Sequence, residues 1–373
     1  MPSPDLLAIS LLVRWLLGWF LCLRMPALPE FTPIGQPRVS VLIPARNEAL
    51  TLPQLLAALA AQSLHPLEVI VIDDHSSDDT AAIAHAAIAH AAIAHAAGVT
   101  VLASAPLPQG WCSKTWALQQ GANRSQGDLL VFLDADTEPR PTFLAQLVAN
   151  HQQYGGLVSV QPFHRTEQPY EQLSVLFNLV GLMAVPLGPR VGVAFGPAMV
   201  TSRSDYGRIG GHASVAGKVV EDWFLAHRYE AAGLPVSAFL GHGSLAYRMY
   251  PGGLSDMVVG FDKNFATAAG EVRWPWMVGV LLWLSGLFWA AWCLPAAVLH
   301  WPMVGDPALA PNLLVYVGYA LQLLVITRRL GTFGWINLVF PVPVLFFLGV
   351  FLLAILNLER GSINWKGRQV PTR

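Results

Sequence analysis

Two carboxylates stand on alternate positions at the end of an apolar run in residues 130–137, Leu-Val-Phe-Leu-Asp-Ala-Asp-Thr. Successive side chains of a strand point to opposite faces, but where the strand ends and the chain turns, Asp134 and Asp136 can converge on one divalent cation. A cation held in this way neutralises a diphosphate group. The spacing therefore predicts a site for a nucleoside diphosphate.

Polar residues close two further apolar strands in the same manner. Residues 38–45 lead into a polar group that ends with Glu48, and residues 67–74 end in the pair Asp73 and Asp74. Ligands of parallel sheets bind beyond the carboxyl ends of the strands. We therefore expect all of these polar residues to lie at one edge of a sheet.

Helix-length segments separate these strands. They cover residues 48–62 and 78–97, and residues 99–105 and 157–163 continue the series of strands. Near-continuous Val, Ile and Leu strands that alternate with helices are typical of a parallel sheet covered on both faces. We predict an α/β fold with a doubly wound, mostly parallel sheet.

Four short motifs follow one another along the chain. They are Ile43-Pro-Ala-Arg-Asn-Glu48, Ile72-Asp-Asp-His-Ser76, Leu133-Asp-Ala-Asp136 and Val220-Glu-Asp-Trp223. Together they resemble the ordered motifs of the inverting glycosyltransferases of family 2, which have the GT-A fold. The resemblance implies transfer of a sugar from a nucleotide sugar.

Six further motifs narrow this resemblance. They are Gly110-Trp-Cys-Ser-Lys114, Ser159-Val-Gln-Pro162, Phe195-Gly-Pro197, Gly210-Gly-His212, Arg248-Met-Tyr250 and Trp365-Lys-Gly-Arg-Gln369. In this order they are similar to the carotenoid-acid branch of the family, and the likeness extends from about residue 39 to residue 370. Each motif alone is weak, whereas the ordered set is specific.

The resemblance assigns the metal to the strand-end acids. Asp136, helped by Asp134, would hold Mg²⁺ or Mn²⁺, a Lewis acid that bridges the diphosphate oxygens. An acidic pair at a strand end can instead cap the next helix, and this alternative stays open for Asp134.

The resemblance also assigns the nucleotide. Asp74, with Asp73 behind it, resembles the carboxylate that accepts a hydrogen bond from uracil, so a UDP-sugar is the expected donor. Pro44, Ala45 and Glu48 would line the same slot. Asp73 is equally suited to be a helix N-cap or a turn residue.

Lys114 is one of four lysines in the chain and belongs to a glycine-containing loop. Such a loop can bring an ammonium group near the phosphates or the sugar. The alternative is a solvated lysine at the start of a helix.

The adjacent acids Glu221 and Asp222 precede a helical segment that begins near Trp223. In the wider family the Asp of this pair is the general base that accepts the proton of an acceptor hydroxyl. The alternative is a first-turn acid that the helix dipole favours. A carotenoid carboxylate is already ionised at neutral pH and requires no base. The presence of Asp222 therefore keeps a hydroxyl acceptor as an alternative.

Further motif residues are candidates for contacts to the acceptor or other parts of the site. They are His212, Trp223, Arg248, Trp365 and Arg368. The chain lacks the Gln-x-x-Arg-Trp motif of processive and ceramide-type relatives, which argues against polymer synthesis. Two apolar stretches, residues 170–193 and 254–265, are short enough to lie in a membrane interface beside a lipid acceptor, although core packing explains them almost as well.

The composition predicts a membrane protein. Hydrophobic residues make up 54% of the chain and charged residues only 12%, with a mean hydropathy of +0.47, whereas roughly a quarter of the residues in a soluble domain are charged. Uncharged stretches cover residues 274–305, 307–327 and 330–358, and residues 6–23 carry only Arg14. Each is about as long as a spanning helix, and the first is interpreted as an anchor, not a cleaved signal.

The basic residues predict the orientation. Arg24 follows the first span and Arg328 and Arg329 follow the third, so the catalytic domain is expected to face the cytoplasm. A fourth crossing would place the tail outside, although this tail is basic. Either the tail is external or one segment is re-entrant or interfacial, and Pro341 and Pro343 make the last segment the suspect.

Other features restrict the function. A net charge of −1 argues against a nucleic-acid partner, and Cys22, Cys112 and Cys293 show no metal-site or CxxC spacing. The sequence Ala-Ala-Ile-Ala-His occurs three times from residue 81 to residue 95. A five-residue step turns each repeat by about 140° on a helix, so these histidines do not share one metal-binding face and the repeat is interpreted as a neutral lengthening.

We therefore expect a membrane-bound, metal-dependent transferase that moves a hexose, most simply glucose, from a UDP-sugar to a carotenoid acid or similar polyisoprenoid lipid. The alternatives are a hopanoid, ceramide or polyprenyl phosphate acceptor and, in another class, a non-enzymatic membrane protein with a degenerate nucleotide domain. The expected domains are an anchor (residues 1–30), a GT-A domain (36–270), membrane helices (274–358) and a basic tail (359–373) in the cytoplasmic membrane.

Overall fold

The computed structural model describes residues 4–93, 98–268, 273–298, 309–358, 362–365 and 368–371. The chain forms two compact units. The first, here called the sheet unit, comprises Pro26–Phe163 and Leu187–Arg248, and the second, the helical unit, comprises Met1–Met25, His164–Pro186 and Met249–Arg373. These boundaries differ from a continuous domain over residues 36–270, because two apolar stretches of that range group with the apolar helices.

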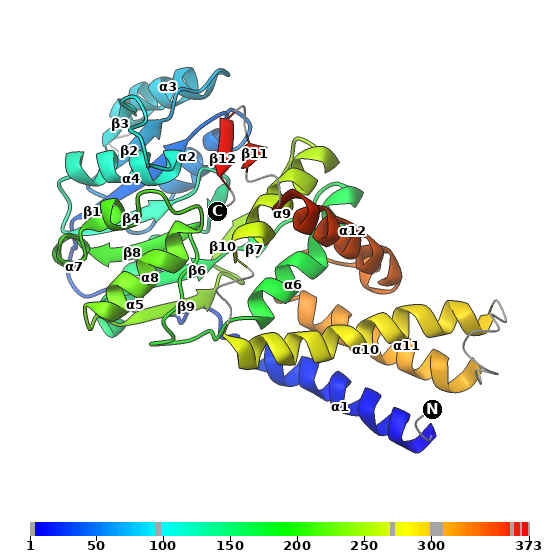
Figure 1. Cartoon of the computed structure of the whole chain (residues 1–373). Helices are drawn as coiled ribbons and strands as arrows, with labels where there is room; N and C mark the ends of the chain where they lie inside the picture. Colours follow the sequence, from blue (N-terminus) through cyan, green and yellow to red (C-terminus); the bar gives the residue numbers. More distant parts are fainter. Residues whose placement is uncertain are drawn as a thin grey trace. The chain divides into compact units, whose positions relative to one another are not determined.

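A seven-stranded sheet forms the centre of the described sheet unit (Figure 1). Its order is β3 (Gly98–Ala103), β2 (Glu68–Asp73), β1 (Val39–Ala45), β4 (Leu129–Leu133), β8 (Ala198–Ser202), β6 (Leu157–Gln161) and β9 (Val236–Leu240). Only β8 runs antiparallel to its neighbours β4 and β6. The predicted fold, a doubly wound and mostly parallel sheet, is confirmed, whereas β8 and β9 were not expected from the sequence.

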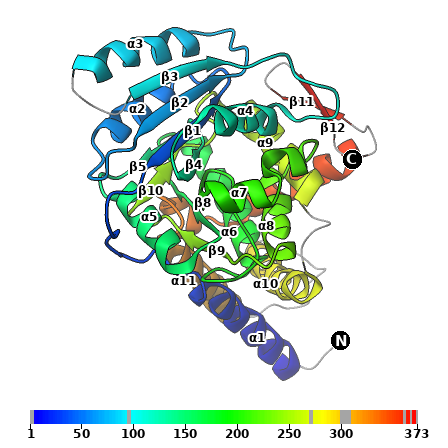
Figure 2. The ribbon, with the colours of Figure 1, turned by 90° about the vertical axis from the view of Figure 1, so that its left-hand side faces the viewer.

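Helices cover both faces of this sheet, as the side view shows (Figure 2). One face carries α2 (Leu52–Ala60), α3 (Thr80–Ile93) and α5 (Phe143–Tyr154), and the other carries α4 (Ser113–Arg124), α7 (Arg203–Arg208) and α8 (Glu221–Ala231). Alternation along β1 explains the two cores. Val41 and Ile43 pack into the first, and Leu42 between them packs into the second.

Short elements continue from the edge of the sheet where the strands end. β5 (Thr137–Pro139) pairs antiparallel with β10 (Leu245–Tyr247), and the 3₁₀ turn η2 (Gly211–Val215) precedes α8. β7 (Phe163–His164) lies in the sequence where the chain passes from the sheet unit to the helical unit. These pieces carry several of the residues that the motifs singled out.

The helical unit contains most of the apolar helices (Figure 1). Its elements are α1 (Pro4–Leu23), η1 (Pro169–Ser174), α6 (Val175–Met183), α9 (Leu254–Ala268), α10 (Trp274–Val298), α11 (Leu309–Thr327), η4 (Trp335–Asn337), α12 (Pro341–Leu358), β11 (Ser362–Trp365) and β12 (Arg368–Pro371). Gln322 of α11 joins three helices, since its amide oxygen accepts from Trp283 at 3.0 Å and its amide nitrogen donates to the Trp15 carbonyl at 2.6 Å.

Within the described residues, three helices are long and apolar enough to cross a membrane: Asp5–Leu23, Trp274–Val298 and Leu309–Thr327. The fourth expected span is different. Residues 330–340 form turns and η4, so the apolar helix that follows is shorter, Pro341–Leu356. The glycines and prolines of this stretch end one helix and begin another.

The alanine-rich repeat forms α3, as expected for its composition. His85 is exposed on this helix. The side chain of His90 and the whole of His95 lie outside the described residues.

Gly156 provides a test of the sheet packing. Its φ is +61°, and an added Cβ would meet the carbonyl oxygen of Pro235, which accepts from the Leu157 amide at 3.0 Å. Gly156→Ala should lower the free energy of unfolding by about 2–5 kcal/mol, from left-handed strain and overpacking together. Gly233, with a φ of +71° and open space at its Cβ, is the matched control, and Gly233→Ala should cost about 1–2 kcal/mol. Equal losses in a denaturation experiment would contradict this packing.

Candidate active site

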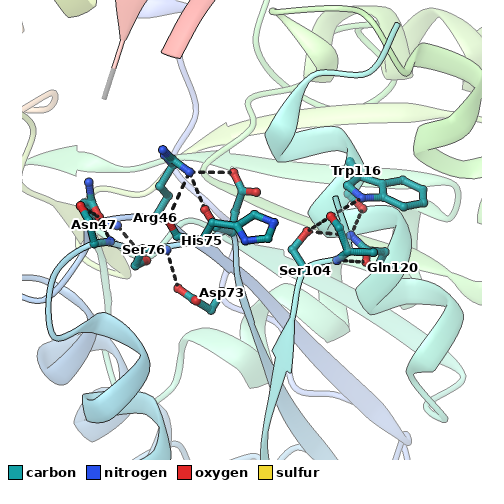
Figure 3. Close-up of polar contacts among 11 residues, drawn as sticks. Arg46, Asn47, Asp73, His75, Ser76, Ser104, Trp116 and Gln120 are labelled. Carbon is teal, nitrogen blue, oxygen red and sulfur yellow. Dashed lines mark hydrogen bonds and ion pairs between the residues drawn. The ribbon is translucent and has the colours of Figure 1, made fainter. Parts of the chain in front are cut away.

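The loops after β1 and β2 are bound to each other at the carboxyl edge of the sheet (Figure 3). Arg46 donates to the carbonyl oxygens of Asp74 at 2.7 Å and His75 at 3.4 Å, and its guanidinium lies 3.9 Å from the Asp74 carboxylate. Asp74 is buried. Arg46 thus fixes the turn that carries Asp74, the acid expected to bind the uracil of the nucleotide.

Side chains of the two loops complete this connection. Asn47, with a φ of +53°, accepts from the Ser77 amide through its side chain at 2.8 Å, and its own amide donates to the Ser76 hydroxyl at 3.1 Å. Asp73 accepts from the Ser76 amide at 3.3 Å. Asp73 is the last residue of β2, and its carboxylate caps the turn that follows the strand; its place behind Asp74 at the nucleotide stays a prediction.

Glu48 is held by hydrogen bonds to residues at the starts of α2 and α3. Its amide donates to the Thr80 hydroxyl at 2.8 Å, and its carboxylate accepts from the Thr51 hydroxyl at 2.9 Å. Pro44 and Ala45 are the last two residues of β1, and the Ala45 carbonyl accepts from the Asp74 amide at 2.8 Å. The residues expected to line the nucleotide slot are thus brought together.

A second polar group follows β3 (Figure 3). The side chain of Gln120 accepts from the Ala105 amide at 2.8 Å and donates to the Ser104 hydroxyl at 2.9 Å. Trp116 donates to the Ala105 carbonyl at 3.0 Å, and its ring meets that of Trp111 edge-on at 4.9 Å. This group orders the loop that leads to α4 and to Lys114.

The turn after β4 holds Asp134 in place. Its amide donates to the Pro197 carbonyl at 2.9 Å, and its carbonyl accepts from the Thr137 hydroxyl at 2.7 Å. Ala135 is buried, while Asp134 and Asp136 on either side of it are half-buried. The alternate spacing thus leaves both acids accessible at the strand end, as expected.

Lys114 does not project into solvent but joins two acids. Its ammonium lies 2.8 Å from one Asp134 oxygen, 3.0 Å from the other and 2.9 Å from Glu221. Burial opposes the charge, but the two carboxylates outweigh it and raise the pKa of Lys114. Burial likewise works to raise the pKa of Glu221, yet the ammonium beside it holds this pKa below the ordinary value. Lys114 is therefore a cation and Glu221 a carboxylate at neutral pH, whereas burial raises the pKa of Asp134 against the opposing effect of the same ammonium.

Asp222 lies next to this cluster at the first turn of α8. Its carboxylate accepts from the Gly196 amide at 2.7 Å and from the Trp223 amide at 2.8 Å. Burial and the neighbouring Glu221 carboxylate raise the pKa of Asp222 to about 6. A carboxylate with this pKa is ionised at pH 7 and yet basic enough to accept a proton, which suits a general base.

His212 lies in the core and is not exposed at all. Its Nδ1 is 2.8 Å from the Tyr206 hydroxyl, its ring contacts that of Phe132 edge-on at 5.0 Å, and burial lowers its pKa to about 4. His212 therefore supports the site from behind as a neutral ring. The half-buried Trp223 packs its ring on His227 at 5.1 Å, in the same helix.

The remaining acceptor candidates fall into both units. The Arg248 amide donates to the Asp136 carbonyl at 3.4 Å, so Arg248 is brought to the strand-end acids. Trp365 and Arg368 face each other across the β11–β12 hairpin of the helical unit.

Of the two acids that follow β4, Asp136 is the better candidate for a metal ligand. Both oxygens of Asp134 are engaged by Lys114, and within the described ranges no three His, Cys, Asp or Glu side chains form a metal-holding group. A cation at Asp136 would have to take most of its ligands from phosphate oxygens and water. This is the manner in which Mg²⁺ is usually bound beside nucleotides.

Comparisons with known proteins agree with this geometry. The family model "Glycosyl transferase family 2" matches residues 40–196. The chain is 32% identical over 343 residues to 4,4'-diaponeurosporenoate glycosyltransferase of Staphylococcus aureus (strain MRSA252), which covers 89% of this chain and 88% of that protein. It is 35% identical over 257 residues to the protein of the same name from Staphylococcus haemolyticus (strain JCSC1435), with 66% of each covered.

A solved structure shares the fold. It is the mannosyltransferase PcManGT from Pyrobaculum calidifontis, in complex with GDP-Man and Mn²⁺, with a TM-score of 0.54, 18% identity and 94% of each chain covered. The sheet, its strand-end acids and these similarities define a glycosyltransferase with a GT-A fold. The chain belongs to glycosyltransferase family 2.

Some site residues escaped the sequence-based assignment. Arg46, Gly196 and Pro197 all lie in quoted motifs, yet none was given a role. The Arg46 guanidinium donates to the Asp74 carbonyl, the Pro197 carbonyl accepts from the Asp134 amide, and the Gly196 amide donates to Asp222. The sequence signal for Gly196 was the Gly-Pro pair. The structure shows why a glycine is needed there, since a Cβ would lie 3.1 Å from the Lys114 ammonium and 3.2 Å from the Glu221 carboxylate.

Removal of the Lys114 charge tests the cluster. Lys114→Met should lower the free energy of unfolding by about 1–3 kcal/mol, because two acids lose their counterion while partial solvent contact limits the cost. Lys218→Met is the control, at an exposed lysine whose ammonium lies 4.4 Å from the centre of the Phe224 ring; loss of this exposed contact should cost less than about 1 kcal/mol. Thermal denaturation of both variants without substrate measures the difference. An unchanged melting curve for Lys114→Met would contradict the ion-pair assignment.

Proposed function

We propose that the protein is a membrane-bound, metal-dependent inverting glycosyltransferase that moves glucose from UDP-glucose to a carotenoid acid or a similar polyisoprenoid lipid. The observation that carries the proposal is the cluster of Asp134, Lys114 and Glu221 beside Asp222, at the edge where the strands end. The names of the staphylococcal relatives supply the acceptor class.

The donor would bind across the first two loops. Asp74, held by Arg46, would accept from the base, and Pro44, Ala45 and Glu48 would line the nucleotide. Asp136 would hold Mg²⁺ or Mn²⁺, which when bound offsets the negative charge of the diphosphate. The Mn²⁺ in the complex of the mannosyltransferase supports a metal, although its GDP-sugar leaves the base to be tested.

Transfer requires attack by an acceptor oxygen on the anomeric carbon while the bond to the diphosphate breaks. With a hydroxyl acceptor, Asp222 would take the released proton. With a carboxylate acceptor no proton is released, because the group is ionised at neutral pH. A hopanoid, ceramide or polyprenyl phosphate acceptor remains the second candidate; the first two present a hydroxyl group, which the basic Asp222 suits.

The two apolar stretches of the helical unit pack into an aromatic cluster. The two stretches that the sequence singled out contribute Phe177 and Phe261, whose rings stack at 4.1 Å. Tyr250 and Phe347 extend this aromatic cluster, at 5.3 Å from Phe261 and 4.9 Å from Phe177 respectively. Phe177, Phe261 and Phe347 are buried, so this cluster is core packing, and the acceptor class rests on the names of the relatives. The protein would lie in the cytoplasmic membrane with the sheet unit on the cytoplasmic side, where basic residues flank the spans.

The direct test is the reaction itself. Membranes that contain the protein are incubated with radiolabelled UDP-glucose, UDP-galactose or GDP-mannose and with defined lipids, and the labelled lipid is identified. Glucose on a carotenoid acid is the expected product. Transfer only to a hydroxyl lipid would favour the second candidate, and no transfer from any donor would overturn the proposal.

A charge at Asp136 should be necessary for the reaction. Asp136→Asn keeps the shape but removes a formal charge from the proposed metal site, so activity should fall by orders of magnitude, and EDTA should abolish the wild-type reaction. Asp128 is exposed in the turn that precedes β4, at the opposite edge of the sheet. Asp128→Asn should therefore leave turnover unchanged. Full activity of the wild-type protein in EDTA would sink the metal assignment.

Asp222 should distinguish the two acceptor classes. Asp222→Asn removes the proposed base, so the rate should fall at least roughly a hundredfold on a hydroxyl lipid and less than about tenfold on a carotenoid acid. The wild-type rate on the hydroxyl lipid should also decline below pH about 6, as Asp222 becomes protonated. Both acceptors are measured with saturating donor on one membrane preparation. A large and equal loss on both would move the base to Glu221.

A further inference from the structure

The segment after α11 carries no Asp, Glu, Lys or Arg from Leu330 to Leu358. If α1, α10 and α11 each cross the bilayer, a fourth crossing by α12 would put the basic tail on the side opposite to Arg328 and Arg329. The contacts of residues 330–358 within the helical unit indicate whether this segment crosses the bilayer or returns to the side where α11 ends.

The segment begins among polar elements. The Leu330 carbonyl accepts from the His164 amide at 2.7 Å, and the Thr332 amide donates to the His164 carbonyl at 2.9 Å. Thr332 also accepts from the Thr166 amide at 2.7 Å. His164 and Thr166 precede η1, which carries the buried Glu171. Polar backbone and charge of this kind belong outside the hydrocarbon layer, on the side where α11 ends.

The chain then passes inward along α11. The Leu338 carbonyl accepts from the Tyr316 hydroxyl at 2.8 Å, and the Phe340 ring lies 4.6 Å from that of Tyr316. Tyr316 is eleven residues before Thr327, which is about 16 Å along a helix axis. Because the hydrocarbon core is about 30 Å thick, α12 starts near its middle.

From this point α12 moves away from α11 towards helices that carry charge. Phe346 and Phe347 contact Phe177 of α6 at 5.8 and 4.9 Å, and Phe177 stacks on Phe261 of α9. α9 begins with the exposed Asp256. Figure 1 shows the last turns of α12 beside α9 and not beside α10 or α11.

We propose that residues 330–358 form a re-entrant element that enters one leaflet and returns to the side from which it came. The partner of α12 is then the acyl chains of that single leaflet. The side chains that face them are Val342, Leu345, Leu352, Ile355 and Leu356, all between 46% and 69% exposed. They continue the apolar surface of α11, where Leu314, Leu321 and Val325 are exposed. The tail lies on the same side as Arg328, which removes the conflict in the charge pattern.

This inference rests on the membrane placement in the proposed function, and a depth measurement tests it. Cys22, Cys112 and Cys293 are first replaced by Ala, Ser and Ala, and the transferase activity of this background is checked. Single cysteines at Val342, Leu345, Leu352 and Leu356 then carry bimane in phosphatidylcholine–phosphatidylglycerol vesicles. Lipids with a nitroxide at a shallow or a deep acyl position report the depth of each label by quenching.

The expected depth falls steadily from residue 342 to residue 356, positions about 21 Å apart on a helix. A crossing helix would instead be deepest at Leu345 and Leu352 and shallow at both ends. Equal depth throughout would mean a helix parallel to the surface, and no quenching would mean a protein partner; each of these three results overturns the re-entrant element. Leu314, Leu321 and Val325 of α11 are the matched control and should show the crossing pattern.

A second readout uses the tail. A cysteine added after Arg373 should react with a membrane-impermeant maleimide in inverted vesicles and not in intact cells. Labelling in intact cells would overturn the proposal. Activity retained in variants that fail the depth test would reject the re-entrant element alone and leave the proposed function standing.

Discussion

One ammonium group holds three segments of the chain together at the edge of the sheet where the parallel strands end. Lys114 comes from the start of α4, Asp134 from the end of β4 and Glu221 from the start of α8. Without this cation the two acids would repel each other in a partly dehydrated place, and the first turn of α4 would lose its ion pairs to β4 and α8. The position of Asp222 follows, because it is the next residue after Glu221 and accepts from Gly196, which lies against the same cluster.

The strand-end acids were predictable because their signal is local. An apolar run of strand length followed by carboxylates fixes both the element and the edge at which the side chains lie, and Asp74, Asp134 and Asp136 are found there. The partner of Lys114 was not predictable, since its neighbours lie 20 and 107 positions further along the chain. His212 shows the same limit, because no local pattern distinguishes a buried imidazole that supports a site from one that contacts a substrate.

Apolar composition predicted helices long enough to cross a membrane, but not the path of each apolar segment. A charge-free stretch gives the length of a segment that lipid tolerates, whereas its path depends on hydrogen bonds such as that of Tyr316 with Leu338. Asn337 belongs to the same turn, where its side chain donates to Thr327 at 2.9 Å. The same side chain donates to the Phe333 and Gly334 carbonyls at 3.1 Å, so side chains satisfy backbone carbonyls where the helix is interrupted.

The reversed direction of β8 has a consequence for how such an enzyme diversifies. A parallel strand needs a crossover connection that packs on the sheet, but a strand that runs the other way can be reached by a connection of any path. The chain uses this freedom between Gln161 and Ala198, where residues 164–186 leave for the helical unit before β8 begins. The end of that excursion, Gly196-Pro197, is anchored to Asp222 and Asp134. Residues 164–186 can therefore change in length or sequence during evolution while β6, β8 and the residues proposed to bind the donor stay unchanged.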